Sequence, residues 1–130
     1  MKRTDSRSLR VLLIDDDAEF RETIAGGLRH RGHDAVAAAD GHSAATRVAE
    51  TAQPFDVIVS DYNLGLRDSR NGIEICEALR PLQPDARYVL MSGLDRQVPD
   101  WIRFAPKEDF GQLFDIVTGP ASTGGDDEAG

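Results

Sequence analysis

Runs of consecutive apolar residues alternate along the chain with stretches in which apolar residues recur every third or fourth position. The apolar runs lie at 11–14, around 56–60, at 88–91 and at 102–105, and a weaker run of small residues covers 34–38. Such runs predict strands that are buried on both faces, as in a parallel sheet. The intervening stretches predict helices between 17 and 32, at 41–51, at 73–79 before Pro81, and at 109–117. Strands that alternate with helices indicate an α/β fold with helices on both sides of the sheet.

One connection is too short for this pattern. Nine residues lie between Ser92 and Ile102, and Pro99 is among them. A parallel crossover normally takes a dozen or more residues and contains a helix. We therefore expect the helix between the fourth and fifth strands to be reduced to a turn or missing.

Two adjacent glycines interrupt the first predicted helix. Gly26 and Gly27 lie inside the stripe formed by Phe20, Ile24 and Leu28, and each costs about 1 kcal/mol relative to alanine. Either the helix backbone packs closely at this point, or the helix is locally weak.

The composition is that of one globular domain. The chain has 130 residues, of which 40% are hydrophobic and 29% charged, enough for a core without disulfides or a structural metal. We expect a domain at 9–118, a flexible segment at 1–8 and a disordered tail at 119–130, where Gly, Ser, Thr and Asp predominate.

Charge and cysteine usage exclude several classes of protein. A formal net charge of −8 argues against a nucleic-acid-binding surface, and no apolar run approaches membrane-spanning length. Cys76 is the only cysteine, which excludes a disulfide framework and indicates a reducing compartment, so we expect a cytoplasmic protein. Cys76 itself is predicted to be a small buried helix residue.

Polar side chains follow four of the predicted strands. They are Asp15 and Asp16 after the first strand, Asp61 after the third, Ser92 after the fourth and Lys107 after the fifth. Parallel strands end at one edge, and neighbouring strands are about 4.8 Å apart. Three carboxylates at that spacing repel one another, so that one takes up a proton or a cation binds between them. Oxygen ligands suit Mg²⁺ better than Zn²⁺, and His30, His33 and His42 are predicted to be surface residues.

These residue types suit phosphoryl transfer. Asp61 could attack phosphorus and form an acyl phosphate, while Mg²⁺ and Lys107 balance the developing negative charge and Ser92 donates a hydrogen bond. Structural alternatives are Ser92 as a helix cap and Lys107 as a solvated surface charge. For Asp17 we expect only a structural role, as the N-cap of the first helix.

The motifs resemble the receiver domain of bacterial two-component response regulators, over residues 9–118. The matching segments are residues 11–17, 39–41, 56–61, 72–74, 89–93 and 104–107. The resemblance implies a flavodoxin-like, doubly wound five-stranded parallel sheet of order 2-1-3-4-5. It further implies that Asp61 is the phosphoacceptor, that Asp15, Asp16, Asp61 and the backbone carbonyl of Asn63 hold Mg²⁺, that Lys107 contacts the phosphoryl group, and that Ser92 and Phe104 form the switch pair.

The resemblance also implies partners and a mode of action. The phosphodonor would be a phosphohistidine on a histidine kinase or histidine phosphotransfer protein, and the downstream protein target is unknown. We expect a monomer or weak dimer that acts as a signalling domain and is not an enzyme beyond its own phosphoryl uptake and hydrolysis. We expect no output domain after the tail, so a stand-alone receiver, a phosphate shuttle or sink, and a part of a relay are all open.

The sequence departs from the family at four places. Gly65 stands where proline is usual, and the loop that leads to Gly72 is about three residues longer than usual. In that loop Arg67 and Arg70 either reach a phosphoryl group or are solvated. Glu108 replaces the proline that customarily follows the lysine, so the cis peptide bond expected there is predicted to be absent. Trp101 either covers the gap left by the missing helix or is an exposed anchor for a partner.

Two other functions compete with this interpretation. A haloacid-dehalogenase-type phosphatase would use Asp15 as nucleophile and Asp17 as acid, but Glu19 stands where that family has Thr or Val, and Asp61 would have no role. A receiver-like binding module that works without phosphorylation is the second alternative; the presence of all five site residues argues against it, and the altered loops keep it open.

Overall fold

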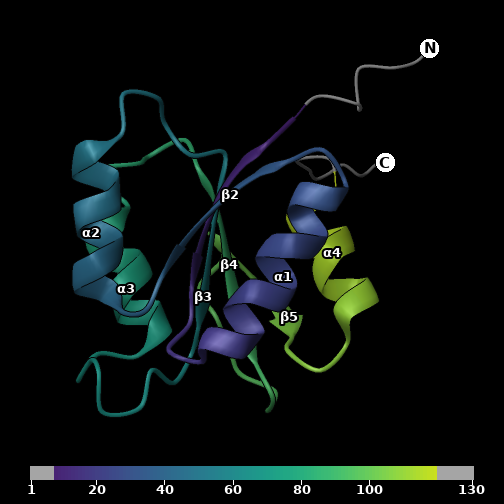
Figure 1. The fold of residues 1–130 in the computed structure, drawn as a ribbon. Coiled ribbons are helices and arrows are strands. Elements are labelled where there is room, and N and C mark those ends of the chain that lie inside the picture. The colour runs from purple at the N-terminus through teal and green to yellow at the C-terminus, as the bar shows by residue number, and fades with distance from the viewer. Residues whose placement is uncertain (1–7, 120–130) are drawn as a thin grey trace.

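The computed structural model describes residues 8–119 and contains one five-stranded parallel sheet between two layers of helices (Figure 1). The elements in chain order are β1 (Arg10–Ile14), α1 (Ala18–His30), β2 (Asp34–Ala38), α2 (Gly41–Glu50), β3 (Val57–Asp61), α3 (Gly72–Leu79), β4 (Arg87–Ser92), β5 (Ile102–Pro106) and α4 (Phe110–Thr118). The strand order is β2-β1-β3-β4-β5, as predicted. The predicted α/β fold class is confirmed.

The predicted end segments lie almost entirely outside the described residues, at 1–7 and 120–130, and the domain limits stay a prediction. Thr118 is described as the last residue of α4, so this helix runs one residue beyond its predicted end. No helix among residues 8–119 combines the length and the apolar character needed to cross a bilayer.

Alternate residues of each strand face opposite helical layers, which explains the uninterrupted apolar runs. In β1, Val11 and Leu13 pack in the core beneath α1 and α4, whereas Leu12 and Ile14 pack in the core beneath α2 and α3. Figure 1 shows these two pairs of helices on opposite sides of the sheet. A strand covered on both faces must be apolar at every position.

No helix lies between β4 and β5, where residues 93–101 form turns and irregular backbone. Val98 and Trp101 from this connection pack against the core on the α2 and α3 side. The Trp101 ring meets Tyr88 edge to face at 5.4 Å, and the Arg80 guanidinium lies 4.2 Å above the Trp101 ring centre. The half-buried Trp101 therefore covers part of the surface that the missing helix leaves open.

Several smaller expectations can be compared with the structure. Cys76 is fully buried, and burial raises the pKa of its thiol to about 12. His30 and His42 are exposed, but His33 is half-buried and its Nδ1 accepts a hydrogen bond from Leu9 N, so calling it a plain surface residue was wrong. Ala49 was expected to face inward and is exposed, because the buried face of α2 follows Gly41, Ala44 and Val48.

The two adjacent glycines of α1 have different surroundings. A Cβ atom at Gly27 would lie 2.5 Å from Cζ of Phe114 in α4, whereas a Cβ at Gly26 would meet nothing within 4 Å. The Arg31 guanidinium covers the same Phe114 ring at 4.0 Å. Close packing therefore accounts for Gly27, and Gly26 leaves the helix locally weak.

We expect opposite effects on stability from alanine at these neighbouring positions. Gly26→Ala should raise the free energy of unfolding by about 0.5–1 kcal/mol, because it lowers the conformational entropy of the unfolded chain and improves helix propensity. Gly27→Ala should lower it by about 1 kcal/mol or more, because the methyl group displaces the Phe114 ring. Urea unfolding of the two variants measures both changes, and equal changes would contradict the packing described for Gly27.

Candidate functional site

Three aspartates meet where β1 and β3 end. Asp15 and Asp16 directly follow β1, Asp61 is the last residue of β3, and the register pairs Ile14 with Ser60. Each of the three carboxylates offers an oxygen within 4.8 Å of the others. The sequence-based prediction that these side chains converge is thus confirmed by their positions.

Asp15 is fully buried, and its two oxygens have different partners. Oδ1 accepts a hydrogen bond from Asp17 N at 2.9 Å, which fixes the carboxylate plane. Oδ2 lies 2.8 Å from Lys107 Nζ and pairs with this ammonium group. A buried carboxylate close to two further carboxylates, with the single charge of Lys107 to offset them, fits a hard divalent cation such as Mg²⁺.

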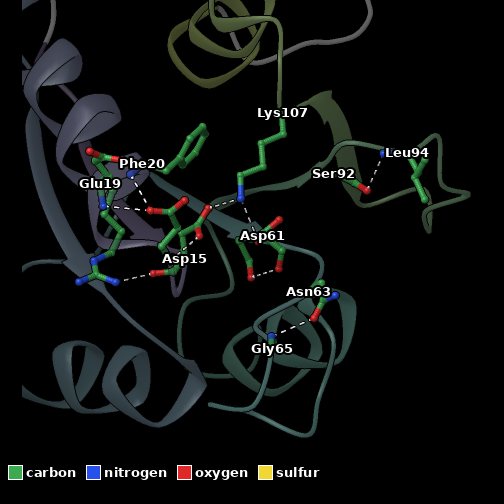
Figure 2. Close-up of polar contacts among 12 residues, drawn as sticks. Asp15, Glu19, Phe20, Asp61, Asn63, Gly65, Ser92, Leu94 and Lys107 are labelled. Carbon is green, nitrogen blue, oxygen red and sulfur yellow. Dashed lines mark hydrogen bonds and ion pairs between the residues drawn. The ribbon is translucent and has the colours of Figure 1, made fainter.

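Lys107 reaches the cluster from the far side of β4. Its backbone N–H donates to Ser92 O at 2.9 Å, and its Nζ lies 3.0 Å from Asp61 Oδ2 (Figure 2). The ammonium group also lies 4.5 Å from the ring centre of Phe20, whose ring meets Phe110 edge to face. The lysine is therefore an interior component of the site, and its alternative as a solvated surface charge is wrong.

The charges in the site shift the pKa values of two of its members. Burial and the neighbouring Asp15 charge raise the pKa of Asp61 to about 6, although Lys107 acts in the opposite direction. Burial alone would lower the pKa of Lys107, but its pairing with Asp15 and Asp61 leaves that pKa above its usual value. Lys107 is thus charged at neutral pH, while Asp61 is a carboxyl group that a proton or a cation stabilises.

Ser92 lies at the same edge, but its hydroxyl oxygen is directed away from Asp61. Figure 2 shows this oxygen pointing at Leu94, whose N–H donates to it at 3.1 Å. Arg96 Nε donates to the same oxygen at 3.4 Å. No helix begins here, so the alternative of Ser92 as a helix cap is wrong. Phe104 is half-buried on β5, opposite Leu90 of β4.

The loop after β3 explains one departure from the family pattern. Gly65 has φ +64°, and a Cβ atom there would lie 2.8 Å from Asp16 Oδ2. Proline is locked near φ −65° and cannot adopt this conformation. Exposed Asn63 fixes the turn, because its Oδ1 accepts a hydrogen bond from Gly65 N at 2.9 Å.

Asp68 anchors the same loop to the N-terminus of α2. Its Oδ2 accepts from Gly41 N at 2.8 Å, and its Oδ1 lies 3.0 Å from Arg70 Nε. Arg70 is therefore engaged with a carboxylate of its own loop, and Arg67 is exposed. Neither arginine forms an ion pair with the aspartate cluster within the described residues. This favours the interpretation that Arg70 stabilises its own loop and that Arg67 is solvated.

Two further expectations can be judged at this site. Asp17 is the N-cap of α1, and its side chain accepts hydrogen bonds from Glu19 N and Phe20 N. This role is the one predicted. Residues 8–119 contain no cis peptide bond, which confirms the expectation for the bond after Lys107.

Sequence reasoning missed three residues that line the site. Phe20 and Arg21 lie in the first turn of α1, and Arg21 Nη1 donates to the carbonyl of Asp15 at 2.7 Å. Their position one turn after a strand end was a usable signal. No signal in the sequence identified Arg96, because this residue belongs to an irregular connection whose path does not follow from any periodicity.

Comparison with known proteins gives consistent matches. Residues 11–108 match the response regulator receiver domain. The DNA-binding response regulator MtrA of Mycobacterium tuberculosis is 36% identical over 116 residues, covering 80% of this chain and 48% of that protein. The transcriptional regulatory protein PrrA of Mycobacterium leprae is 34% identical over 90 residues, covering 69% of this chain and 36% of that protein. The solved receiver domain of the hybrid histidine kinase CckA is 28% identical with a TM-score of 0.70, covering 83% of this chain and 94% of that one.

The fold, the edge of the sheet that carries the aspartates and these matches define a signalling domain. The chain belongs to the response regulator receiver family of two-component systems. It spans 36% and 48% of the length of the two curated relatives named above.

The pKa of Asp61 predicts how stability depends on pH in protein stripped of divalent ions. The folded pKa of about 6 lies above the ordinary 3.8, so the contribution of Asp61 to stability should be fully present below 3.8 and be lost as the pH rises to about 6. Asp61→Asn removes the buried charge and should be more stable than the wild type above pH 6, by up to about 3 kcal/mol. Urea unfolding in a chelator across this pH range measures the difference.

Asp68→Asn is the matched control with the opposite sign. Hydrogen bonds from Arg70 and from the backbone lower the pKa of Asp68, so its contribution is present above pH 3.8 and is lost as the pH falls. This variant should be less stable than the wild type at neutral pH. A destabilised Asp61→Asn variant above pH 6 would contradict the electrostatic account of the site.

Proposed function

We propose that this receiver domain accepts a phosphoryl group on Asp61. The observation that carries the proposal is the position of Lys107 Nζ between the carboxylates of Asp61 and Asp15, at 3.0 and 2.8 Å. A fixed cation beside a carboxylate, at the edge where an α/β sheet binds ligands, stabilises the negative charge of a transferring phosphoryl group.

The transfer step is a displacement at phosphorus. A carboxylate oxygen of Asp61 forms the new bond to phosphorus, and the bond from phosphorus to the donor nitrogen of a phosphohistidine breaks, with the electron pair leaving on that nitrogen. Lys107 would pair with an oxygen of the phosphoryl group, and in doing so it would exchange part of its contact with Asp61. Phe20, beneath the ammonium group, keeps water from one side of this lysine.

Asp15, Asp16 and Asp61 would hold Mg²⁺, together with the backbone carbonyl of Asn63. When bound, Mg²⁺ would supply positive charge that offsets the repulsion among the carboxylates and the phosphoryl oxygens. Full burial and the hydrogen bond from Asp17 N restrict the side chain of Asp15. These restraints favour a preorganised ligand set over one assembled on binding.

Ser92 and Phe104 would report the phosphorylated state. The Ser92 hydroxyl would turn toward the phosphoryl group, and Phe104 would move into the space that this opens, which would bias a two-state surface near β4 and β5. Because no helix connects β4 to β5, the surface would consist of the edge of β5 and the connection from 93 to 101.

A histidine kinase or histidine phosphotransfer protein is the proposed donor, docking near α1 and the loops of the site. The target is a protein that recognises the altered β4 and β5 surface. We further propose a cytoplasmic monomer or weak dimer whose only chemistry is its own phosphoryl uptake and hydrolysis.

Incubation with acetyl phosphate and Mg²⁺ tests the proposal directly. The intact mass of the wild type should increase by one phosphoryl group, and the adduct should be lost at alkaline pH, as expected for an acyl phosphate. Asp61→Asn should abolish the adduct because the nucleophile is gone, and a chelator should prevent its formation.

The matched control is Asp100→Asn, which alters an exposed aspartate in the connection before β5. This variant should be modified like the wild type. A wild type that stays unmodified while it still binds a partner would instead support the phosphorylation-independent binding module.

A further inference from the structure

The side chain of Arg96 joins the two strand ends that carry the proposed phosphoacceptor and switch residues. Its guanidinium carbon lies 3.7 Å from the ring centre of Tyr62, the residue that directly follows Asp61. Its Nε donates to the Ser92 hydroxyl oxygen at 3.4 Å. Arg96 comes from the connection between β4 and β5, so the loss of the usual helix is what allows this arrangement.

Two donors hold the hydroxyl of Ser92 in its present orientation. A hydroxyl group has two acceptor positions, and here Leu94 N and Arg96 Nε occupy them at 3.1 and 3.4 Å. Ser92 is 5% exposed, so water has little access to replace either donor. Rotation of the hydroxyl toward Asp61 must therefore break the contact with Arg96.

The contact with Tyr62 keeps Arg96 in place. The backbone of Tyr62 is held by two hydrogen bonds, from its N–H to Met91 O at 2.9 Å and from Gly72 N to its carbonyl at 2.8 Å, and its side chain packs against the core on the α2 and α3 side. A guanidinium stacked on a fixed aromatic ring loses little further freedom when it forms a hydrogen bond. The hydrogen bond to Ser92 is thus held by a rigid neighbour and does not depend on a flexible surface side chain.

We propose that Arg96 is a positioning residue that holds the Ser92 hydroxyl in the resting orientation and so opposes the phosphorylated state. This inference rests on the proposed function of Asp61. When a phosphoryl group is bound, its anionic oxygens compete with Arg96 for Ser92, and the rotation of Ser92 proceeds only after the Arg96 contact is released. The free energy needed to break the Arg96 contact is therefore subtracted from the free energy gained when the phosphoryl group binds.

Beryllofluoride, a stable phosphoryl mimic that binds aspartate with Mg²⁺, measures this effect at equilibrium. Fluorine NMR of the bound species gives the apparent dissociation constant. Arg96→Ala should bind about fivefold more tightly than the wild type, because a hydrogen bond from a charged group no longer has to be broken. Arg96→Lys should also bind more tightly, because an ammonium group lacks the planar Nε donor stacked on Tyr62.

A double-mutant cycle with Ser92→Ala separates positioning from general stabilisation. If Arg96 acts through the hydroxyl, Arg96→Ala should leave the affinity of the Ser92→Ala variant unchanged. The matched control is Arg80→Ala, which removes an arginine stacked on Trp101 beyond the far end of α3. That variant should bind beryllofluoride like the wild type.

Each other result overturns a distinct claim. Weaker binding by Arg96→Ala, or the same change with and without Ser92, would overturn the positioning role while leaving phosphorylation of Asp61 intact. A wild type that binds no beryllofluoride would overturn the proposed function and this inference with it.

Discussion

Three aspartates and one lysine at a single edge of the sheet create the electrostatic constraint on which the rest of the site depends. Lys107 Nζ lies within 3.0 Å of both Asp15 and Asp61, but one positive charge cannot balance three negative ones. Burial, and after it the neighbouring charge of Asp15, raises the pKa of Asp61 to about 6. A site with this imbalance is stabilised by whatever brings positive charge to it. The fold thus holds the three carboxylates in a repulsive arrangement, and a divalent cation can reduce this repulsion.

The parallel sheet makes this concentration of charge possible. β1 and β3 are neighbours, and their register brings Asp15 and Asp61 close together. Lys107 comes from the far edge strand, and its long side chain spans the width of β4 to reach them. The cores on both faces fix the strands at whose ends these residues lie.

The sequence predicted the parts of the molecule that follow from periodicity. The apolar runs identified all five strands, and the polar residues at their ends identified the aspartate cluster and Lys107. It could not predict contacts made by irregular backbone. Residues 93–101 follow an irregular path in which Trp101 packs on Tyr88 and Arg96 lies beside Ser92 and Tyr62. The sequence shows that Gly65 departs from the family pattern. The reason, a positive φ beside Asp16, is visible only in the structure.

The short connection between β4 and β5 changes the site as well as the surface. A helix there would cover the core with its own apolar face, whereas here Val98 and Trp101 provide the cover. The irregular connection places the guanidinium group of Arg96 at the edge of the sheet, beside Ser92 and Tyr62. Loss of a regular element has in this way added a side chain to the neighbourhood of the proposed switch residue.

Titration with Mn²⁺, followed by broadening of the backbone amide signals in NMR spectra, tests the central claim most directly. A shared divalent ion predicts that the amides of Asp16, Tyr62 and Lys107 broaden first, and that Asp16→Asn suppresses this selective broadening. Broadening scattered over exposed acidic residues such as Glu77 and Asp85, and unchanged in the variant, would contradict the claim that the three aspartates form one cation site.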